Sequence, residues 1–286
     1  MNLDDLFVYS QHAAPQHLIS RLAGKVAECE IPRVKNKIIS WFIQKYGVNM
    51  AEAALQSPED FRHFNDFFTR ALKEDARPLD KTKKGIISPV DGAVSQLGDI
   101  SHGQIFQAKG QSFSVVELLG GDVERAEPFI GGKFATIYLS PKDYHRIHMP
   151  CKGTLREMVY IPGKLFSVNP ATAQNVPRLF ARNERVAAIF DTEFGPMAMV
   201  LVGAMIVASI ETVWSGLVAP LKRQVKTTQY GGSVKDLQLK KGDEMGRFKL
   251  GSTVVLAFPP NATEFIESLK AESPVQMGQA FGKILV

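Results

Sequence analysis

Leu250-Gly251-Ser252-Thr253-Val254-Val255-Leu256-Ala257-Phe258 decides the fold of this chain, because it joins a glycine turn to an uninterrupted apolar run of β type. As a plain structural pattern, Leu-Gly-Ser-Thr predicts a turn that enters a strand. A second interpretation is chemical. Glycine lacks a Cβ, so Gly251 can take strained backbone angles that leave its carbonyl open to the Ser252 hydroxyl. These four residues alone do not decide between the two interpretations.

The chemical interpretation predicts a peptide bond that breaks itself. Attack of the Ser252 hydroxyl on the Gly251 carbonyl moves the acyl group from nitrogen to oxygen. Elimination of that ester leaves dehydroalanine, and hydrolysis then gives ammonia and a pyruvoyl group. The chain would become two, residues 1–251 and residues 252–286, and its cofactor would come from its own backbone.

Composition places the chain among globular proteins. Its 286 residues suit one large domain or two modest ones, with 45% hydrophobic and 22% charged residues. The net charge of +5 suits an anionic partner, either lipid headgroups or nucleic acid, and equally suits solvated lysines kept for solubility. Runs of like charge do not exceed pairs such as Lys83-Lys84, which argues against an arm that binds nucleic acid.

Cysteine usage and hydropathy indicate a cytosolic setting. Cys29 and Cys151 provide neither a disulfide framework nor zinc spacing. Residues 1–20 lack the basic start and continuous apolar segment of a signal peptide. The longest uncharged apolar stretch, residues 197–210, is shorter than the ~20 residues of a spanning helix, so we expect one or two buried strands there.

The pattern of apolar residues changes near residue 76. Before it, residues 17–23 and 37–46 show helical spacing, and Ser57-Pro58-Glu59-Asp60 is typical of a helix start. Phenylalanines in residues 61–72 form a stripe that predicts core packing, with a lipid surface as the alternative. Trp41 and Phe42, between lysines, suit either a membrane interface or an ordinary amphipathic helix.

After the polar linker of residues 77–85, short β-type runs alternate with glycine and proline. This spacing predicts a mainly antiparallel β barrel or sandwich. Helical spacing recurs only in residues 115–119 and 264–269. The expected fold class is therefore α+β, with a helical region over residues 1–76 and a β-rich domain over residues 77–286.

Two histidines are candidates to activate Ser252, because serine is a weak nucleophile unless a base takes its proton. They lie in Asp143-Tyr144-His145-Arg146-Ile147-His148. In an extended segment His145 and His148 point to opposite faces, and only one can address Ser252; in a turn both can line one pocket. A His-x-x-His pair could also be half of a metal site, but no third ligand stands at metal spacing, so we expect no metal.

Asp91, within Pro89-Val90-Asp91-Gly92, either caps a turn or holds the tautomer of a histidine base. The order Asp, His, Ser also suits a serine hydrolase, although Ser252 lacks the Gly-x-Ser-x-Gly elbow. Ser167 and Asn169 follow Pro162-Gly163, where a hydroxyl and an amide either stabilise a turn or hold a carboxylate or phosphate.

Several motifs in the same order resemble the bacterial phosphatidylserine decarboxylases, which depend on a pyruvoyl group. The resemblance covers roughly residue 60 to the C-terminus. It is carried by residues 88–92, 143–150, 166–169, 250–253 and the run from Leu179 to Trp214.

The resemblance implies cleavage between Gly251 and Ser252 into a β chain (1–251) and an α chain (252–286). Asp91, His148 and Ser252 would form the charge relay for this autocleavage. The pyruvoyl group from Ser252 would form a Schiff base with phosphatidylserine, His145 would protonate the substrate after carbon dioxide leaves, and phosphatidylethanolamine would be released. Ser167 is favoured over Asn169 for binding substrate.

The resemblance also implies a location and partners. N-terminal helices would hold the enzyme peripherally on an anionic membrane surface, at the cytoplasmic face of the bacterial cell membrane. A homodimer is expected, and neither nucleic acid nor a diffusible cofactor is.

Overall fold

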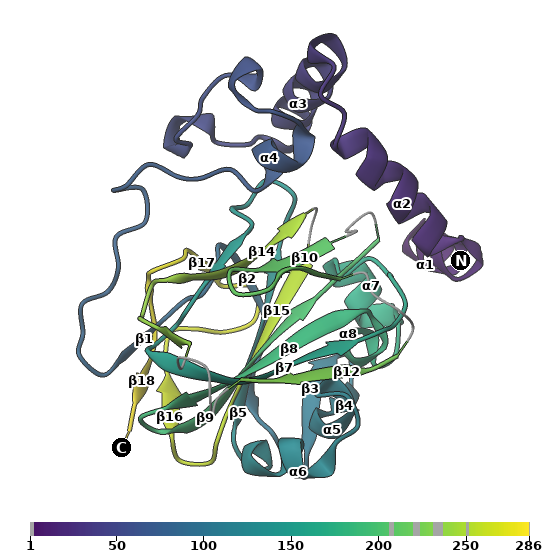
Figure 1. The fold of residues 1–286 in the computed structure, drawn as a ribbon. Coiled ribbons are helices and arrows are strands. Elements are labelled where there is room, and N and C mark those ends of the chain that lie inside the picture. The colour runs from purple at the N-terminus through teal and green to yellow at the C-terminus, as the bar shows by residue number, and fades with distance from the viewer. Residues whose placement is uncertain (1–2, 206–208, 220–223, 231–236, 250–251, 286) are drawn as a thin grey trace.

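The computed structural model describes residues 3–205, 209–219, 224–230, 237–249 and 252–285. Helices come first, and they lie along one side of a β-rich body whose C-terminal end is at the opposite side (Figure 1). The helical elements of this region are α1 (Leu3–Ala13), α2 (Gln16–Ala27), α3 (Pro32–Tyr46), the single turns η1 (Met50–Glu52) and η2 (Pro58–Asp60), and α4 (Phe64–Phe68).

Helix α3 shows how the sequence sets these elements. Pro32 occupies its first turn, where a missing N–H costs nothing, and Gly47 ends it at a φ of 66°. Its inner face buries Ile39 and Phe42. These two pack with the predicted phenylalanine stripe into a small separate core, which confirms the core-packing interpretation; the stripe residues buried there are Phe61, Phe64, Phe67 and Phe68.

The main sheet has nine strands and places Ser252 at the start of its central strand. Its path, antiparallel throughout, is β12 (Lys226–Gln229), β7 (Gly153–Ile161), β8 (Arg185–Thr192), β9 (Gly195–Val202), β15 (Ser252–Phe258), β5 (Lys133–Leu139), β2 (Gly92–Asp99) and β17 (Pro274–Val275), with β13 (Gln238–Leu239) also on β7. Every residue of β15 is buried, as its apolar run requires.

Smaller sheets surround this one. The first is β11 (Gly216–Ala219), β10 (Ser209–Thr212), β14 (Glu244–Lys249) and β6 (Arg146–His148); the second is β1 (Gly85–Ile87), β18 (Ala280–Ile284) and β16 (Thr263–Phe265); the third is the hairpin β3 (Gln104–Ala108) and β4 (Gln111–Ser114). Short helical segments fill the loops: α5 (Val115–Leu118), α6 (Val123–Ala126), η3 (Glu127–Phe129), α7 (Pro170–Asn175) and α8 (Leu179–Arg182).

The α+β class with a mainly antiparallel sheet is confirmed. In the described part of the chain the nine-stranded sheet runs as an open path from β12 to β17, so the sandwich alternative holds rather than a closed barrel. Residues 197–210 contribute to two strands, β9 and β10, as expected. None of the described helices is long and apolar enough to cross a membrane.

The helical spacing of residues 264–269 gave a wrong prediction. Thr263 to Phe265 form strand β16, and turns follow. The tertiary context decides this, because Thr263 pairs with Ile284 of β18 and the Phe265 ring packs on Phe281 at 5.5 Å between ring centroids.

Candidate active site

Ser252 is buried at the first position of β15, with 0% of its surface exposed. Its cross-strand partner on β5 is Leu139. The Ser252 hydroxyl has no hydrogen-bond partner among the described residues. Buried hydroxyls are normally paired, so an unpaired one at this position is chemically available. Gly251, the other half of the predicted cleavage site, lies outside the described residues.

Two long-range pairings bring the histidine motif to this strand. Strand β14, which precedes Ser252, runs antiparallel to β6, and the Phe248 N–H donates to the His145 carbonyl at 3.1 Å. Strand β5, which pairs with β15, ends at Leu139 and leads into the same motif. Ser252 therefore lies beside the end of β5, where the chain enters the histidine motif, and follows β14, which pairs with that motif.

His145 is fully buried and neutral. Its Nδ1 lies 2.8 Å from the Asp143 carbonyl oxygen. A carbonyl only accepts, so Nδ1 carries the hydrogen and Nε2 carries a lone pair. That Nε2 has no partner among the described residues. Burial lowers the pKa of His145 to about 3, and the Phe68 ring covers the imidazole at 4.0 Å between ring centroids.

Both nitrogens of His148 are occupied. Nδ1 donates to the Gly242 carbonyl at 2.8 Å, and the Tyr144 hydroxyl lies 2.9 Å from Nε2. By the same argument Nε2 carries the lone pair and accepts from Tyr144. Burial lowers the pKa of His148 as well. The histidine expected to activate Ser252 therefore has its lone pair engaged, whereas the lone pair of His145 has no partner in the part of the chain that the structure describes.

Asp91 is held by an arginine. Arg77 Nε and Nη2 donate to its two carboxylate oxygens at 2.9 and 2.5 Å, and the Met277 N–H donates at 2.9 Å. Among the described residues no hydrogen bond joins Asp91 to His148. The connection between them is electrostatic, because the charge of Asp91 favours the protonated form of His148. A backbone hydrogen bond also joins their two segments, since the His148 N–H donates to the Pro89 carbonyl at 2.9 Å.

Ser167 and Asn169 have structural partners. The Asn169 side chain accepts from the Thr172 N–H at 2.9 Å and caps α7. The Ser167 hydroxyl accepts from the Asn169 N–H at 3.4 Å, and the Ser167 backbone N–H donates to Gln11 of α1 at 2.7 Å. No hydrogen bond in the described structure joins either residue to Ser252 or to the histidines, so the turn-stabilising role is the one that the geometry displays.

A cleft of about 620 Å³ lies between the helical region and the sheets. Of the predicted site residues, Asp91 is in its described lining, together with Arg70, Arg77, Tyr144 and Pro170, whereas Ser252 and the two histidines are not. Within the described residues no group of three or more His, Cys, Asp and Glu side chains could hold a metal ion.

Sequence reasoning missed three of these residues. Tyr144 lies inside the histidine motif. A phenol can hydrogen-bond to an imidazole four residues away, and that capacity could have predicted the contact with His148. Arg70 and Arg77 lie in the helical region and the linker, and only long-range packing brings them to Asp91.

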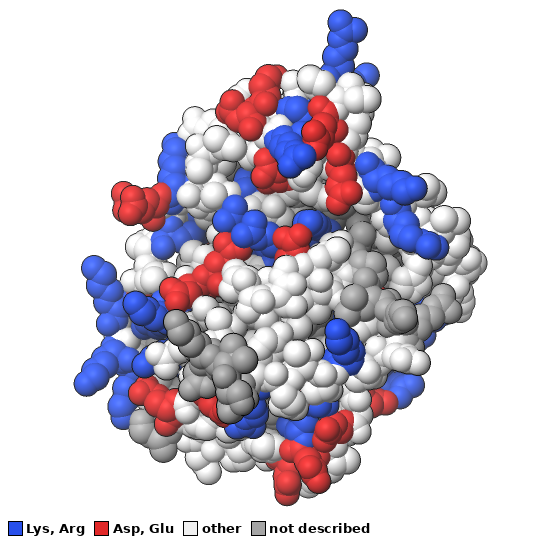
Figure 2. Space-filling model, in the orientation of Figure 1, with Lys and Arg blue, Asp and Glu red and all other residues white. Residues whose placement is uncertain are grey.

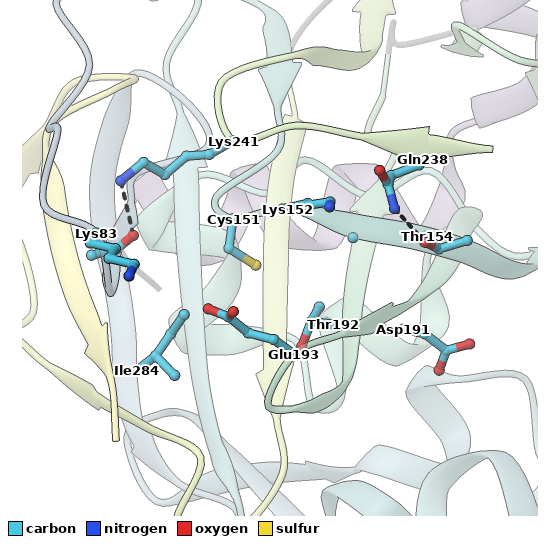
Figure 3. Close-up of a pocket in the computed structure, with 12 residues that line it drawn as sticks. Lys83, Cys151, Lys152, Thr154, Asp191, Thr192, Glu193, Gln238, Lys241 and Ile284 are labelled. Carbon is cyan, nitrogen blue, oxygen red and sulfur yellow. Dashed lines mark hydrogen bonds between the residues drawn. The ribbon is translucent and has the colours of Figure 1, made fainter. Parts of the chain in front are cut away.

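A second pocket, of about 520 Å³, contains none of the predicted site residues (Figure 3). Lys241 reaches across it to the carbonyls of Thr82 and Gly85 at 2.9 and 3.1 Å. Burial raises the pKa of the Cys151 thiol to about 12, which leaves it protonated and a poor nucleophile. The Asp91 cleft is therefore the better candidate site.

Comparison with known proteins gives a consistent result. The family model described as phosphatidylserine decarboxylase matches residues 64–283, and a second, described as PSD, matches residues 6–47. The chain belongs to the phosphatidylserine decarboxylase family. It is similar to the phosphatidylserine decarboxylase proenzyme of Pseudomonas fluorescens strain Pf0-1, with 63% identity over 97% of this chain and 98% of the relative.

Two more members of the phosphatidylserine decarboxylase family show the same relationship, and both are named phosphatidylserine decarboxylase proenzyme. That of Stutzerimonas stutzeri strain A1501 is 63% identical over 99% of this chain and 96% of the relative. That of Bordetella pertussis strain Tohama I is 60% identical over 96% of this chain and 93% of the relative. The similarity therefore includes the helical region as well as the β-rich domain.

Proposed function

We propose that this chain is a phosphatidylserine decarboxylase made as a proenzyme, which cuts itself before Ser252 and then converts phosphatidylserine to phosphatidylethanolamine. The observation that carries the proposal is the Ser252 hydroxyl, which is buried, has no hydrogen-bond partner among the described residues and comes directly after the glycine of Leu-Gly-Ser-Thr. Near-complete similarity to proteins named as proenzymes supports both the activity and the processing.

For self-cleavage, Ser252 Oγ attacks the carbonyl carbon of Gly251 and loses its proton to His148, while Asp91 stabilises the resulting imidazolium. The C–N bond between the two residues then breaks. Loss of the Ser252 α-proton expels the Gly251 carboxylate, and water replaces the nitrogen as ammonia. The geometry adds one condition: the Tyr144 hydroxyl must first turn away from His148 Nε2.

The pyruvoyl group that remains supplies an electrophilic carbonyl, which captures the amine of the substrate and takes up the electron pair released with carbon dioxide. The site fits such a group, because the Ser252 side chain is buried and none of the described residues makes a competing hydrogen bond to it. Exclusion of water protects a reactive carbonyl of this kind and the carbanion that follows decarboxylation.

His145 moves the proton in this proposal. Its neutral ring has a lone pair on Nε2 that no described residue engages, so it must gain a proton before it can donate one. The substrate amine arrives as an ammonium ion and must lose a proton to react. His145 takes that proton and returns it to the α-carbon after carbon dioxide has left.

Attachment to a membrane is proposed through α2. Leu18, Leu22 and Val26 recur at intervals of four along this helix and are 49%, 56% and 54% exposed. Exposed Arg21 and Lys25 stand between them. An apolar stripe edged with cations suits an anionic bilayer surface. On the face seen in Figure 2, cations and anions are otherwise interspersed over the β-rich body.

The proposal also includes the face of the membrane on which the enzyme lies and its oligomeric state. The stripe on α2 would hold the enzyme peripherally at the cytoplasmic face of the cell membrane. The partner expected from the family resemblance is a second copy of the chain.

The activity is tested with vesicles of phosphatidylserine labelled at the serine carboxyl carbon. The proposal predicts release of labelled carbon dioxide in equal amount to new phosphatidylethanolamine, and no release by Ser252→Ala. Release of free fatty acid or free serine without carbon dioxide would instead indicate a serine hydrolase.

A further inference from the structure

Arg70 is a buried cation whose hydrogen bonds are incomplete. It lines the cleft of Asp91 and is only 4% exposed. Its Nη2 donates to the Lys142 carbonyl at 2.9 Å and to the Asp143 carbonyl at 3.4 Å. Its Nε and Nη1 have no partner among the described residues, and none of the described carboxylates lies at salt-bridge distance from it.

Other buried arginines of the chain are satisfied. Arg185, 3% exposed, donates from Nε, Nη1 and Nη2 to three backbone carbonyls. The Arg77 side chain is paired with Asp91 and Glu52, and that of Arg125 with Glu157. An uncompensated buried charge costs several kcal/mol. The Arg70 guanidinium lies 5.6 Å from the Phe67 ring centroid and has no carboxylate in contact among the described residues, so an anionic ligand in its cleft would offset part of that cost.

We propose that Arg70 is the receptor for the phosphodiester group of the substrate. This inference rests on the proposed function, since it takes phosphatidylserine as the ligand. Nε and Nη1 each carry an N–H without a described hydrogen-bond partner, and a phosphate oxygen is a strong acceptor for an N–H of a charged guanidinium. The phosphate enters the cleft and accepts from one of these N–H groups. It adds a contacting negative charge to the carboxylates of Asp91, Asp143 and Glu52, which act on Arg70 from beyond salt-bridge distance.

The substrate carries two anionic groups, a carboxylate and a phosphodiester. The course of the reaction favours the phosphodiester as the partner of Arg70. The carboxylate loses its charge as it becomes carbon dioxide. A cation paired with it would stabilise the ground state more than the transition state and slow the reaction. The phosphodiester keeps its charge throughout, so a cation bound to it anchors the substrate without opposing the chemistry.

The position of Arg70 suits this role. Arg70 Nη2 and His145 Nδ1 both donate to the Asp143 carbonyl oxygen, at 3.4 and 2.8 Å. The guanidinium that would bind the phosphate and the imidazole that would move the proton are therefore hydrogen-bonded to the same carbonyl oxygen. In a serine phospholipid the phosphorus and the α-carbon are separated by one methylene and one oxygen, so both groups of one headgroup fit this arrangement.

The test compares two substrates in the same detergent micelles: phosphatidylserine, and an O-alkyl serine ether that keeps the amine and carboxylate but has no phosphate. For processed Arg70→Gln we expect KM for phosphatidylserine to rise about 10- to 100-fold, the loss of a charged hydrogen-bonded pair. KM for the ether stays within about twofold. Arg70→Lys restores part of the loss because it keeps the charge.

Lys142→Gln is the matched control, since it removes an exposed cation from the same cleft. We expect it to change KM for either substrate by less than about threefold, as for an exposed charge. An equal rise of KM for both substrates in Arg70→Gln would overturn the proposal in favour of carboxylate binding or a structural role. An unchanged KM for phosphatidylserine would overturn it outright.

A measurement on the unaltered enzyme covers the case in which Arg70→Gln fails to fold or to cleave. Glycerophosphoethanolamine and an ethanolamine alkyl ether both lack the carboxylate, and only the first carries a phosphate. Inhibition at least tenfold stronger by the first supports the site, and equal inhibition refutes it. Failure of the proposed function is seen separately, because the unaltered chain would then release no carbon dioxide.

Discussion

The Tyr144 hydroxyl lies 2.9 Å from Nε2 of His148 and occupies the lone pair that a general base would need. Both side chains are buried, and Nδ1 of the same imidazole donates to the Gly242 carbonyl. His148 is therefore oriented and in the neutral form, but engaged. His145, three residues earlier, differs, because its Nε2 has no hydrogen-bond partner within the described segments.

Removal of the Tyr144 hydroxyl should release His148. In Tyr144→Phe the ring remains and only the hydrogen bond is lost, so we expect self-cleavage to become about fivefold faster, the equivalent of about 1 kcal/mol. The rate is followed on denaturing gels after synthesis in a cell-free system. Cleavage slowed tenfold or more would show instead that the hydroxyl takes part in the proton transfer.

Substitution of each histidine should separate processing from turnover. We expect His148→Gln to remain one chain, because Ser252 then has no base. We expect His145→Gln to be cut normally and to lose about 10²- to 10⁴-fold in decarboxylation, the usual contribution of a general acid or base. Intact mass and carbon dioxide release are measured on the same samples. The reverse pattern would assign the free Nε2 of His145 to processing.

Stability should fall on the acid side because His145 is buried in its neutral form. Its pKa is about 3 in the folded chain, below the ordinary 6.5 of an exposed histidine. The unfolded state thus binds a proton that the folded state does not, so stability is full above pH 6.5 and declines as the pH falls from 6.5 toward 3, by up to about 1.4 kcal/mol per pH unit.

Urea unfolding of Ser252→Ala at several pH values measures this slope on a single uncut chain. Adding His145→Gln removes the titrating group, and we expect a shallower slope between pH 6.5 and 4. Identical slopes with and without His145 would mean that other groups account for the acid sensitivity.

The α2 stripe should control binding to vesicles. Leu22→Glu places a charge on a surface that would enter the bilayer, and we expect sedimentation with anionic vesicles to weaken at least about tenfold, from the lost burial of one leucine. Val123→Glu is the control, because Val123 on α6 is 64% exposed at the end of the molecule away from the helices (Figure 1). Equal losses in the two variants, or none in Leu22→Glu, would argue against docking through α2.

Local sequence patterns predicted the elements better than the contacts between them. The apolar run after Ser252 was sufficient for a buried strand, and the phenylalanine stripe was sufficient for a core. The spacing of His145 and His148 could not say which lone pair is free, because that depends on Gly242 and Tyr144. Residues 264–269 show the limit for elements, since pairing with β18 overrode helical spacing.

The arginines of the cleft show the same limit for the site. Arg77 comes from the linker and donates to both carboxylate oxygens of Asp91. It thereby makes the contact that a histidine was expected to make. A family motif marks which residues matter, but it does not include a partner from another segment. Such partners emerge only when the helical region is packed on the sheets.

The central claim is most directly tested by the mass of the purified protein under denaturing conditions. The account predicts two polypeptides, residues 1–251 and residues 252–286, the second blocked at its N-terminus by a pyruvoyl group, and one uncut chain for Ser252→Ala. A single intact chain that still converts phosphatidylserine at the full rate would contradict it.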